Sequence, residues 1–361
     1  MKMRLFTPGP LNTSDRVRSA LNHDLGSREP HFKKILQQTR TKILELSGLN
    51  PERYTSVLLP GSGTNMLEAS LRLMKQNQKR LLIIANGAYG ERLGLIAESI
   101  GLDYEIQRHP ELEAINWSRV EDSIALSGNY TSLAMVHCET STGQLNDLAK
   151  LRDIADEHHL DIYLDGMSSF AGVPFDYSSL PLAVLVSSSN KCLHGIPGFG
   201  LALLNKGLLD ENVKPAGSIA LDLTSHWRNQ NDKSEFLFTP PTHAMVALRE
   251  AIQELEESGG ISQRASRYSE RYEYITARMT RLGFTPLLAP ELRSNIITAY
   301  EERNDVSFSN LYQGLCREGC VIYPGKASDT ASFRIGNIGD LTMGDLEHLV
   351  ATISAIIHQN T

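Results

Sequence analysis

Cysteine is scarce in this sequence. The 361 residues contain four cysteines, and their scattered positions fit reduced thiols rather than a disulfide framework. Cys316 and Cys320 stand four residues apart on an expected helix, but no further His or Cys lies at the close spacing that a metal site needs. We therefore expect no bound metal ion.

Long apolar segments and clusters of positive charge are also missing. The longest apolar runs, such as LLIIA at 81–85, are far too short to span a membrane. The first residues, MKMRLFTPGPLN, contain prolines in place of the apolar region of a signal peptide. The net charge is −7 and no block of Lys or Arg stands out. We expect a cytoplasmic protein that binds neither membranes nor nucleic acid.

The composition is that of a globular protein, with 41% hydrophobic and 21% charged residues. Up to about residue 206, short apolar runs bounded by Gly, Pro or Ser alternate with longer segments of helical periodicity. This alternation is typical of βαβ units around a largely parallel sheet. The predicted strands, some with the turn that follows, are 55–61, 80–87, 132–143, 160–169, 182–191 and 198–206, and the predicted helices between them are 64–76, 88–101 and 146–159.

The pattern changes after about residue 245. Helical segments at 243–260, 261–283, 307–319 and 341–359 are mixed with strand-like segments at 294–300, 320–325 and 331–336, which indicates a compact α+β domain. The chain is also too long for the commonest single core. We predict an N-terminal segment (1–15) that packs near the active site and the small domain, a large domain (16–250) and a small C-terminal domain (251–361).

The turn GSGT at 61–64 is the first candidate functional feature. It lies between a predicted strand and a predicted helix, where backbone N–H groups converge and the helix dipole favours an anion. It matches neither the Walker pattern nor GxGxxG, and glycine-rich turns also occur for steric reasons. The turn alone therefore leaves a phosphate-binding role and a purely steric role open.

Asp165 and Lys191 follow two successive predicted strands. The carboxyl ends of parallel strands lie at one edge of a sheet, so both side chains are expected at that edge. A buried carboxylate is costly unless it meets a cation or a donor, although Asp165 is equally consistent with a turn or helix cap. Burial favours the neutral amine of Lys191, which is the form that attacks a carbonyl. With the 61–64 turn, these residues match the minimum needs of pyridoxal phosphate (PLP): a phosphate cradle, a carboxylate for the ring nitrogen and a lysine for the aldehyde.

At this point the sequence resembles a known family. It is similar to the fold-type I, class V aminotransferases over almost the whole chain, and within them to the branch that acts on 2-aminoethylphosphonate and pyruvate. The matching stretches are TPGPL (7–11), YTSVLLPGSGT (54–64), NGAYGER (86–92), AMVHCETSTG (134–143), DGMSSFAGVP (165–174), SSSNKCLHGIPGFG (187–200), FTPPTH (238–243), VIYPGK (321–326) and FRIGNIG (333–339).

The resemblance implies an α/β fold of the PLP-dependent transferase type I, with a mostly parallel seven-stranded sheet in the large domain. It also implies Lys191 and Asp165 as the catalytic residues. The remaining cofactor contacts that it implies are Ser62, Gly63, Thr64, Tyr89 on the ring, Thr140, Ser189 or the adjacent Asn190, and Thr239 and Thr242 from a neighbouring subunit. The last two contacts imply a homodimer with shared active sites.

For the substrate, the resemblance implies that Arg334 holds the acid group, since Arg suits bidentate capture of carboxylate or phosphonate. The segment LGSREPHF (25–32) is more similar to class V aminotransferases in general than to the phosphonate branch. Arg28 in this segment is a further candidate for substrate binding, and the departure leaves the substrate contacts of the N-terminal region open. The expected reaction transfers the amino group of 2-aminoethylphosphonate to pyruvate and gives phosphonoacetaldehyde and L-alanine.

Alternatives remain open at this stage. The atypical 25–32 segment keeps an alanine- or serine–glyoxylate aminotransferase in view. A cysteine desulfurase fits less well, because Asn190 and Tyr89 stand where that branch has histidines. A non-catalytic regulator that binds PLP or a nucleotide is the alternative from another class. At single positions, Tyr89 also suits simple packing, and Thr239 and Thr242, beside two prolines, also suit a turn.

Overall fold

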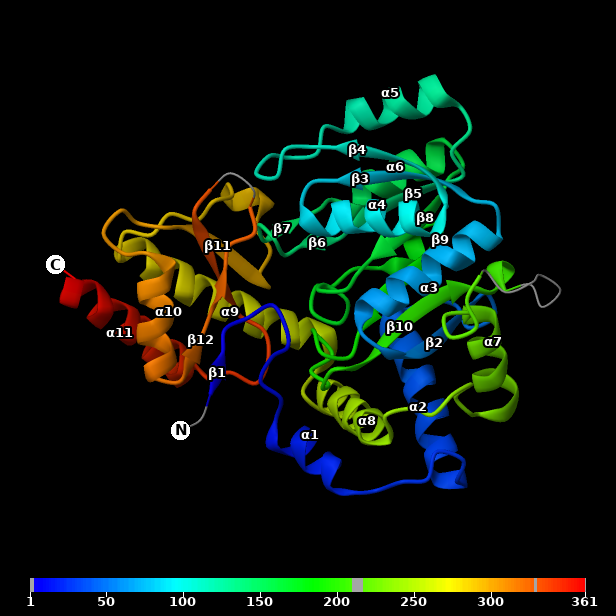
Figure 1. Cartoon of the computed structure of the whole chain (residues 1–361), viewed down its shortest axis with the longest axis horizontal. Coiled ribbons are helices and arrows are strands. Elements are labelled where there is room, and N and C mark those ends of the chain that lie inside the picture. The colour runs from blue at the N-terminus through cyan, green and yellow to red at the C-terminus, as the bar shows by residue number, and fades with distance from the viewer. Residues whose placement is uncertain (1–2, 210–216, 328–329, 361) are drawn as a thin grey trace.

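The computed structural model describes residues 3–209, 217–327 and 330–360. A large α/β part and a smaller C-terminal part lie side by side, and the N-terminal segment runs along the smaller part before it reaches the larger one (Figure 1). Among the residues that the structure describes, no helix is both long and apolar enough to cross a membrane.

A seven-stranded sheet forms the centre of the large part, as predicted. Its strands lie in the order β2 (Tyr54–Gly61), β10 (Gly198–Asn205), β9 (Leu182–Ser188), β8 (Asp161–Asp165), β5 (Ser132–Val136), β3 (Arg80–Ala85) and β4 (Asp103–Arg108). Only β10 runs antiparallel to its neighbours, and the other pairs, from β9 to β4, are parallel. The carboxyl ends of β2, β3, β5, β8 and β9 therefore share one edge.

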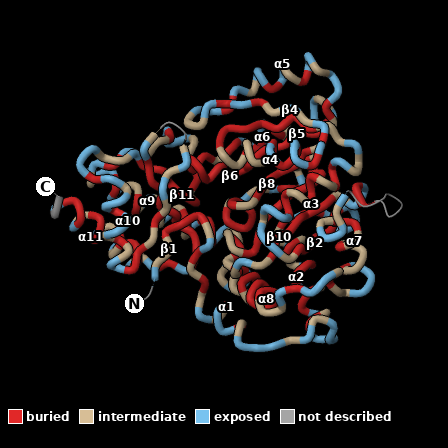
Figure 2. Tube along the Cα trace, viewed as in Figure 1, coloured by how far each residue is buried: buried red, intermediate tan, exposed pale blue. Residues whose placement is uncertain are grey.

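Helices cover both faces of this sheet, because successive residues of a strand point to opposite sides. Along β5, for example, Leu133 and Met135 enter one hydrophobic core and Ala134 enters the other. The first core is shared by α2 (Pro30–Ser47), α5 (Trp117–Ser127), α6 (Leu148–Glu157) and α8 (Thr242–Glu257). The second is shared by α3 (Gly63–Gln76), α4 (Ala88–Ile100) and α7 (Leu223–Arg228). In Figure 2 the strands of the sheet are coloured mostly as buried, whereas much of α5 is coloured as exposed.

The smaller part has its own core and its own sheet. Strands β11 (Ile297–Glu301), β14 (Ser332–Gly336) and β13 (Tyr323–Pro324) pair antiparallel in that order. Helices α9 (Gly260–Arg281), α10 (Phe308–Arg317) and α11 (Met343–Asn360) pack against them. Strand β1 (Arg4–Leu5) pairs parallel with β12 (Cys320–Val321), and Phe6 enters the same core. The N-terminal segment is thus anchored on the smaller part.

Several elements lay outside the sequence prediction. Strand β4 is an edge strand of the sheet, and helix α5 follows it in the chain. Most residues of β4 are polar, and half of the strand's residues are exposed. Helices α1 (Asp15–Ser19), α2 and α7 and the short hairpin of β6 (Cys138–Glu139) and β7 (Gln144–Leu145) were not predicted either. The proposed domain boundary at 250 falls within α8, which packs with the core of the large part, and the domain division stays a prediction.

Candidate active site

A cavity of about 430 Å³ lies at the edge where the carboxyl ends of the parallel strands meet. The turn after β2, the end of β8, the turn after β9 and the start of α4 all contribute to its wall. The structure brings seven of the predicted site residues together there: Ser62, Gly63, Thr64, Tyr89, Thr140, Asp165 and Lys191.

The 61–64 turn forms the N-terminus of α3. Ser62 is the N-cap: its hydroxyl accepts a hydrogen bond from the backbone N–H of Asn65, and the Asn65 side chain accepts one from the backbone N–H of Ser62 at 2.8 Å. Gly63 and Thr64 occupy the first turn, where a helix leaves N–H groups without partners in the helix. A Cβ atom at position 63 would clash with the sulfur of Met167, so a larger residue there would have to displace that side chain. This arrangement suits an anion such as a phosphate group.

Asp165 ends β8, and only 3% of it is exposed. One carboxylate oxygen accepts a hydrogen bond from the backbone N–H of Met167 at 2.8 Å. Burial raises the pKa of Asp165 to about 6, although the Met167 bond and the charges of Arg92 and Lys191 act in the opposite direction. A carboxylate in this position lacks solvation and would be stabilised by a cationic N–H group.

Lys191 lies in the turn that follows β9, with its amine inside the cavity wall. Its Nζ donates a hydrogen bond of 2.7 Å to the carbonyl of Pro8 and lies 3.5 Å from that of Gly9. Gly9 has φ +110°, and a Cβ atom there would collide with the Lys191 side chain. Burial lowers the pKa of Lys191, which makes the neutral, nucleophilic amine more accessible.

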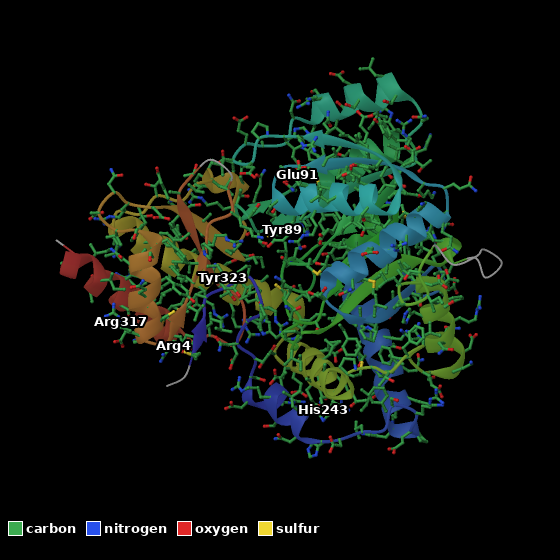
Figure 3. All side chains as sticks on the ribbon, in the orientation of Figure 1. Arg4, Tyr89, Glu91, His243, Arg317 and Tyr323 are labelled. Carbon is green, nitrogen blue, oxygen red and sulfur yellow. The ribbon has the colours of Figure 1, made fainter. Side chains whose placement is uncertain are left out.

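Tyr89, Thr140 and Arg334 form one connected group at another part of the wall. Arg334 lies on β14 of the smaller part, 3% exposed, and donates to the carbonyl of Pro324 at 2.9 Å and to that of Thr140 at 2.7 Å. Its charge also acts on the phenol of Tyr89 and lowers the pKa of that group. Arg334 does not itself line the cavity, but it bonds Thr140, which does. Figure 3 shows Tyr89 at the junction of the two parts, on the side of Tyr323, which pairs with Arg334 in the sheet.

The electrostatics of Tyr89 follow from this position. Burial alone would raise the pKa of its phenol, but Lys326, Lys191 and Arg334 together lower it. Two cations also lie near the Tyr89 ring, with the Arg92 guanidinium 4.6 Å and the Lys326 amine 5.0 Å from its centroid. This part of the wall is therefore strongly positive and suits an anionic group.

Glu139 was not predicted as a site residue, although it is fully buried beside the cavity wall. Its carboxylate accepts hydrogen bonds from the backbone N–H groups of Tyr89 at 3.0 Å and Gly90 at 3.1 Å. It also accepts two from Ser141, from the backbone N–H and the hydroxyl. Because Gly87, the N-cap of α4, has no side chain, Glu139 supplies the missing acceptor. The available signal in the sequence was that α4 begins without a Ser, Thr or Asp N-cap, so that its first N–H groups need another acceptor.

Arg92 was also missed. It lines the cavity between the two anion-binding parts, and its Nη1 lies 3.5 Å from the Thr64 hydroxyl. It stands three residues after Tyr89 on α4, and residues at this spacing share a helix face. That spacing was the signal in the sequence.

Ser189 is not placed in the cavity. Its hydroxyl donates to the carbonyl of Ile196 at 2.6 Å, and Ser188 and Asn190 line the cavity instead. The reason is the pleat of the chain, which turns neighbouring side chains to opposite sides. Among the described residues, the buried hydroxyl of Ser188 has no hydrogen-bond partner.

Three other predicted residues lie outside the cavity within this chain. Arg28 and Thr239 line a separate cavity of about 300 Å³, together with Glu235 and the exposed Phe238. Thr242 is the first residue of α8 and does not line the main cavity. Whether a second copy brings Thr239 and Thr242 to the site remains a prediction.

The residues of the main cavity fit PLP. The first turn of α3 suits the phosphate, and the unpartnered Ser188 hydroxyl is a further donor for it. The buried carboxylate of Asp165 suits a protonated ring nitrogen, and the Lys191 amine suits the aldehyde. A volume of about 430 Å³ lies within the usual range for a cofactor site.

Comparisons with known proteins agree with this chemistry. The family model "Aminotransferase class-V" matches residues 14–335. The chain is 38% identical to a 2-aminoethylphosphonate–pyruvate transaminase of Vibrio vulnificus, over 98% of this chain and 97% of that protein. It is 38% identical to the transaminase of the same name from Bacteroides fragilis, over 97% of each. Among solved structures, the fold is similar to that of the ureidoglycine–glyoxylate aminotransferase from Bacillus subtilis, with a TM-score of 0.91 and 19% identity over 100% of this chain and 94% of that one.

Proposed function

The chain belongs to the class-V aminotransferase family, and from this premise we propose that it is a PLP-dependent 2-aminoethylphosphonate–pyruvate transaminase. It transfers the amino group of 2-aminoethylphosphonate to pyruvate, which gives phosphonoacetaldehyde and L-alanine, a reaction of phosphonate metabolism. The observation that carries the proposal is the meeting of Lys191, Asp165 and the 61–64 turn in one cavity. The relatives of that name support the choice of substrates, since they match nearly the full length of the chain.

When bound, PLP withdraws electrons from the carbon that carries the amine, which acidifies its proton. The residues of this chain would supply the rest. Asp165 would keep the ring nitrogen protonated, because a buried carboxylate is stabilised by that cationic N–H. Lys191 Nζ would remove the acidified proton and return it, and the low pKa produced by burial keeps the amine ready to accept it. The carbonyls of Pro8 and Gly9 would orient this amine when it is free.

The anion-binding residues would fix the cofactor and the substrates. Ser62, Gly63, Thr64 and Ser188 would bind the cofactor phosphate, and Arg92 would add a positive charge beside Thr64. Tyr89 would cover the ring, and Thr140 would contact its hydroxyl side. Arg334 would attract the phosphonate of one substrate and the carboxylate of the other, since a guanidinium binds both.

The assembly and the compartment belong to the same proposal. The active unit would be a homodimer in which Thr239 and Thr242 of each copy complete the phosphate site of the other. Phe238 stands beside Thr239, is half exposed, and would be covered by such an interface. Arg28 lies in the same region and would contact substrate only across such an interface. The protein would act in the cytoplasm.

The test is product identification. The PLP-loaded protein is mixed with 2-aminoethylphosphonate and pyruvate, and phosphonoacetaldehyde and alanine are followed by phosphorus and proton NMR. We expect both products in equal amounts. Alanine or serine with glyoxylate serves as the competing pair. Faster turnover of that pair, with no conversion of 2-aminoethylphosphonate, would contradict the proposed substrates and leave the transaminase chemistry intact.

A further inference from the structure

The anion-binding part of the cavity wall has to bind two acid groups of different charge, the phosphonate of one substrate and the carboxylate of the other. A phosphonate becomes a dianion as the pH rises through its second ionisation, which lies above the value near 6 of a phosphate ester because carbon replaces the ester oxygen, whereas a carboxylate carries one charge. Arg334 provides a single positive charge, and its guanidinium already bonds the carbonyls of Pro324 and Thr140. A second cation at the same place would match the second charge of the phosphonate.

Lys326 is the cation in that position. It follows β13 and is exposed, and its amine lies 5.0 Å from the centroid of the Tyr89 ring, which lines the cavity. Among the nearby cations Lys326 lowers the pKa of the Tyr89 phenol most, ahead of Lys191 and Arg334. The charge of Lys326 therefore acts on the same space as that of Arg334.

The charge of Lys326 is also not neutralised within the described residues, where it forms no salt bridge with a carboxylate. The two other cations near Tyr89 have other tasks. Arg92 lies beside Thr64 at the cofactor phosphate, and Lys191 is needed for the covalent and proton-transfer chemistry. Lys326 is left to act on the substrate.

We propose that Lys326 is a specificity-determining residue that favours a dianionic phosphonate over a monoanionic carboxylate at the anion-binding part of the cavity. This role rests on the proposed function. It places the discrimination between the two substrates on the smaller part of the chain, next to Arg334. Arg334 would bind either acid group, and Lys326 would add affinity only for the second charge.

Binding of unreactive acids tests the role directly. Ethylphosphonate and propionate lack the amine, and calorimetry measures their affinity for the PLP-loaded protein at about pH 9, above the second ionisation of an alkylphosphonate. We expect Lys326→Gln to weaken ethylphosphonate about three- to fivefold, the upper range for a solvent-accessible charge pair, and propionate less than about twofold. Lys326→Arg should restore most of the loss. Lys150→Gln, an exposed lysine on α6 outside the cavity, is the matched control and should change neither affinity.

The pH gives a second arm. Near pH 5 ethylphosphonate is largely a monoanion, so the loss caused by Lys326→Gln should shrink to that of propionate. Equal losses for both acids at about pH 9, or no loss for either, would overturn the role of Lys326. Amino transfer from 2-aminoethylphosphonate by the wild-type protein is measured in parallel. Its absence would contradict the proposed function, whereas its presence together with equal losses would contradict only the role of Lys326.

Discussion

The two sides of the cavity are built in different ways. The cofactor side, defined here as Ser62–Thr64, Asp165, Ser188 and Lys191, consists of residues at the ends of neighbouring strands of one sheet. The substrate side, defined as Tyr89, Thr140, Lys326 and Arg334, combines the start of α4, a loop after β5 and a hairpin of the smaller part. A sheet edge fixes the first side locally, whereas the second exists only when the two parts pack together. We therefore expect changes on the two sides to affect different steps.

The largest effect is expected for Lys191→Ala on the cofactor side. The change removes both the covalent attachment of PLP and the proton-transferring amine, so turnover should fall by at least about 10⁴-fold. The absorption band of the bound cofactor should move to that of free PLP. Lys150→Ala is the control and should leave both unchanged. Residual turnover within about tenfold of the wild type would show that Lys191 does not take part in the chemistry.

Asp165→Asn should change the pH dependence of stability of the cofactor-free protein. Burial raises the pKa of Asp165 from 3.8 to about 6, so the folded state binds the proton more tightly than the unfolded state. The stability supplied by that proton is present below about pH 4 and is lost as the pH rises through 6. The Asn variant should therefore exceed the wild type by up to about 3 kcal/mol at pH 8 and by about half of that near pH 5.

Chemical unfolding of the two proteins at several pH values measures this difference. PLP should reduce or reverse it, because its ring nitrogen supplies the cationic partner that Asp165 lacks. A difference that is constant from pH 5 to pH 8 would mean that Asp165 does not titrate in this range.

Glu139→Gln tests the support of the substrate side. The amide keeps the shape but loses the charge and one acceptor for the N–H groups of Tyr89 and Gly90, so the Tyr89 ring is held less firmly. We expect kcat/KM to fall about 10- to 100-fold, as for a misplaced positioning residue, and PLP affinity to fall by a smaller factor, because Tyr89 also covers the cofactor ring while the contacts of the cofactor side remain. Glu98→Gln, an exposed residue on the same helix, is the control. An equal loss of PLP affinity and turnover would show that the two sides are not separate.

The smallest effect is expected for Ser188→Ala. In the cofactor-free protein the buried hydroxyl lacks a partner, so its removal should be neutral or should stabilise the fold by up to about 1 kcal/mol. PLP affinity should fall, because the phosphate loses a donor. Ser189→Ala makes the opposite comparison: it breaks the bond to Ile196 and should destabilise the fold, with little effect on PLP affinity. Thermal unfolding and a PLP titration distinguish the two serines.

The position of Asp165 and Lys191 at one edge of the sheet was predictable for a physical reason. Asp165 and Lys191 each follow a buried strand, and parallel strands bring their carboxyl ends to one edge whatever the loops do. The substrate side was harder. Arg334 was assigned by resemblance, but its bonds to Thr140 and Pro324 depend on how the smaller part docks. Glu139 acts through the backbone of a helix that lies elsewhere in the sequence, and no local pattern shows such a contact.

Two differences between expectation and structure have the same origin. Ser189 or Asn190 was expected at the cavity, and Asn190 and Ser188 line it, because a run of serines carries no alternation from which to read the pleat. Strand β4 was missed because an edge strand need not be apolar, and its six residues, DYEIQR, lack the buried run of the central strands. In both cases the neighbouring elements, rather than the composition of the segment itself, determine which side chains face the interior.

The absorption spectrum of the PLP-loaded protein tests the central claim most directly. 2-Aminoethylphosphonate is added first, without a keto acid, and pyruvate is added after it. The account predicts that the phosphonate abolishes the band of the lysine-bound cofactor and that pyruvate restores it. A band that responds to alanine or serine but not to 2-aminoethylphosphonate would contradict the assignment of the substrate side.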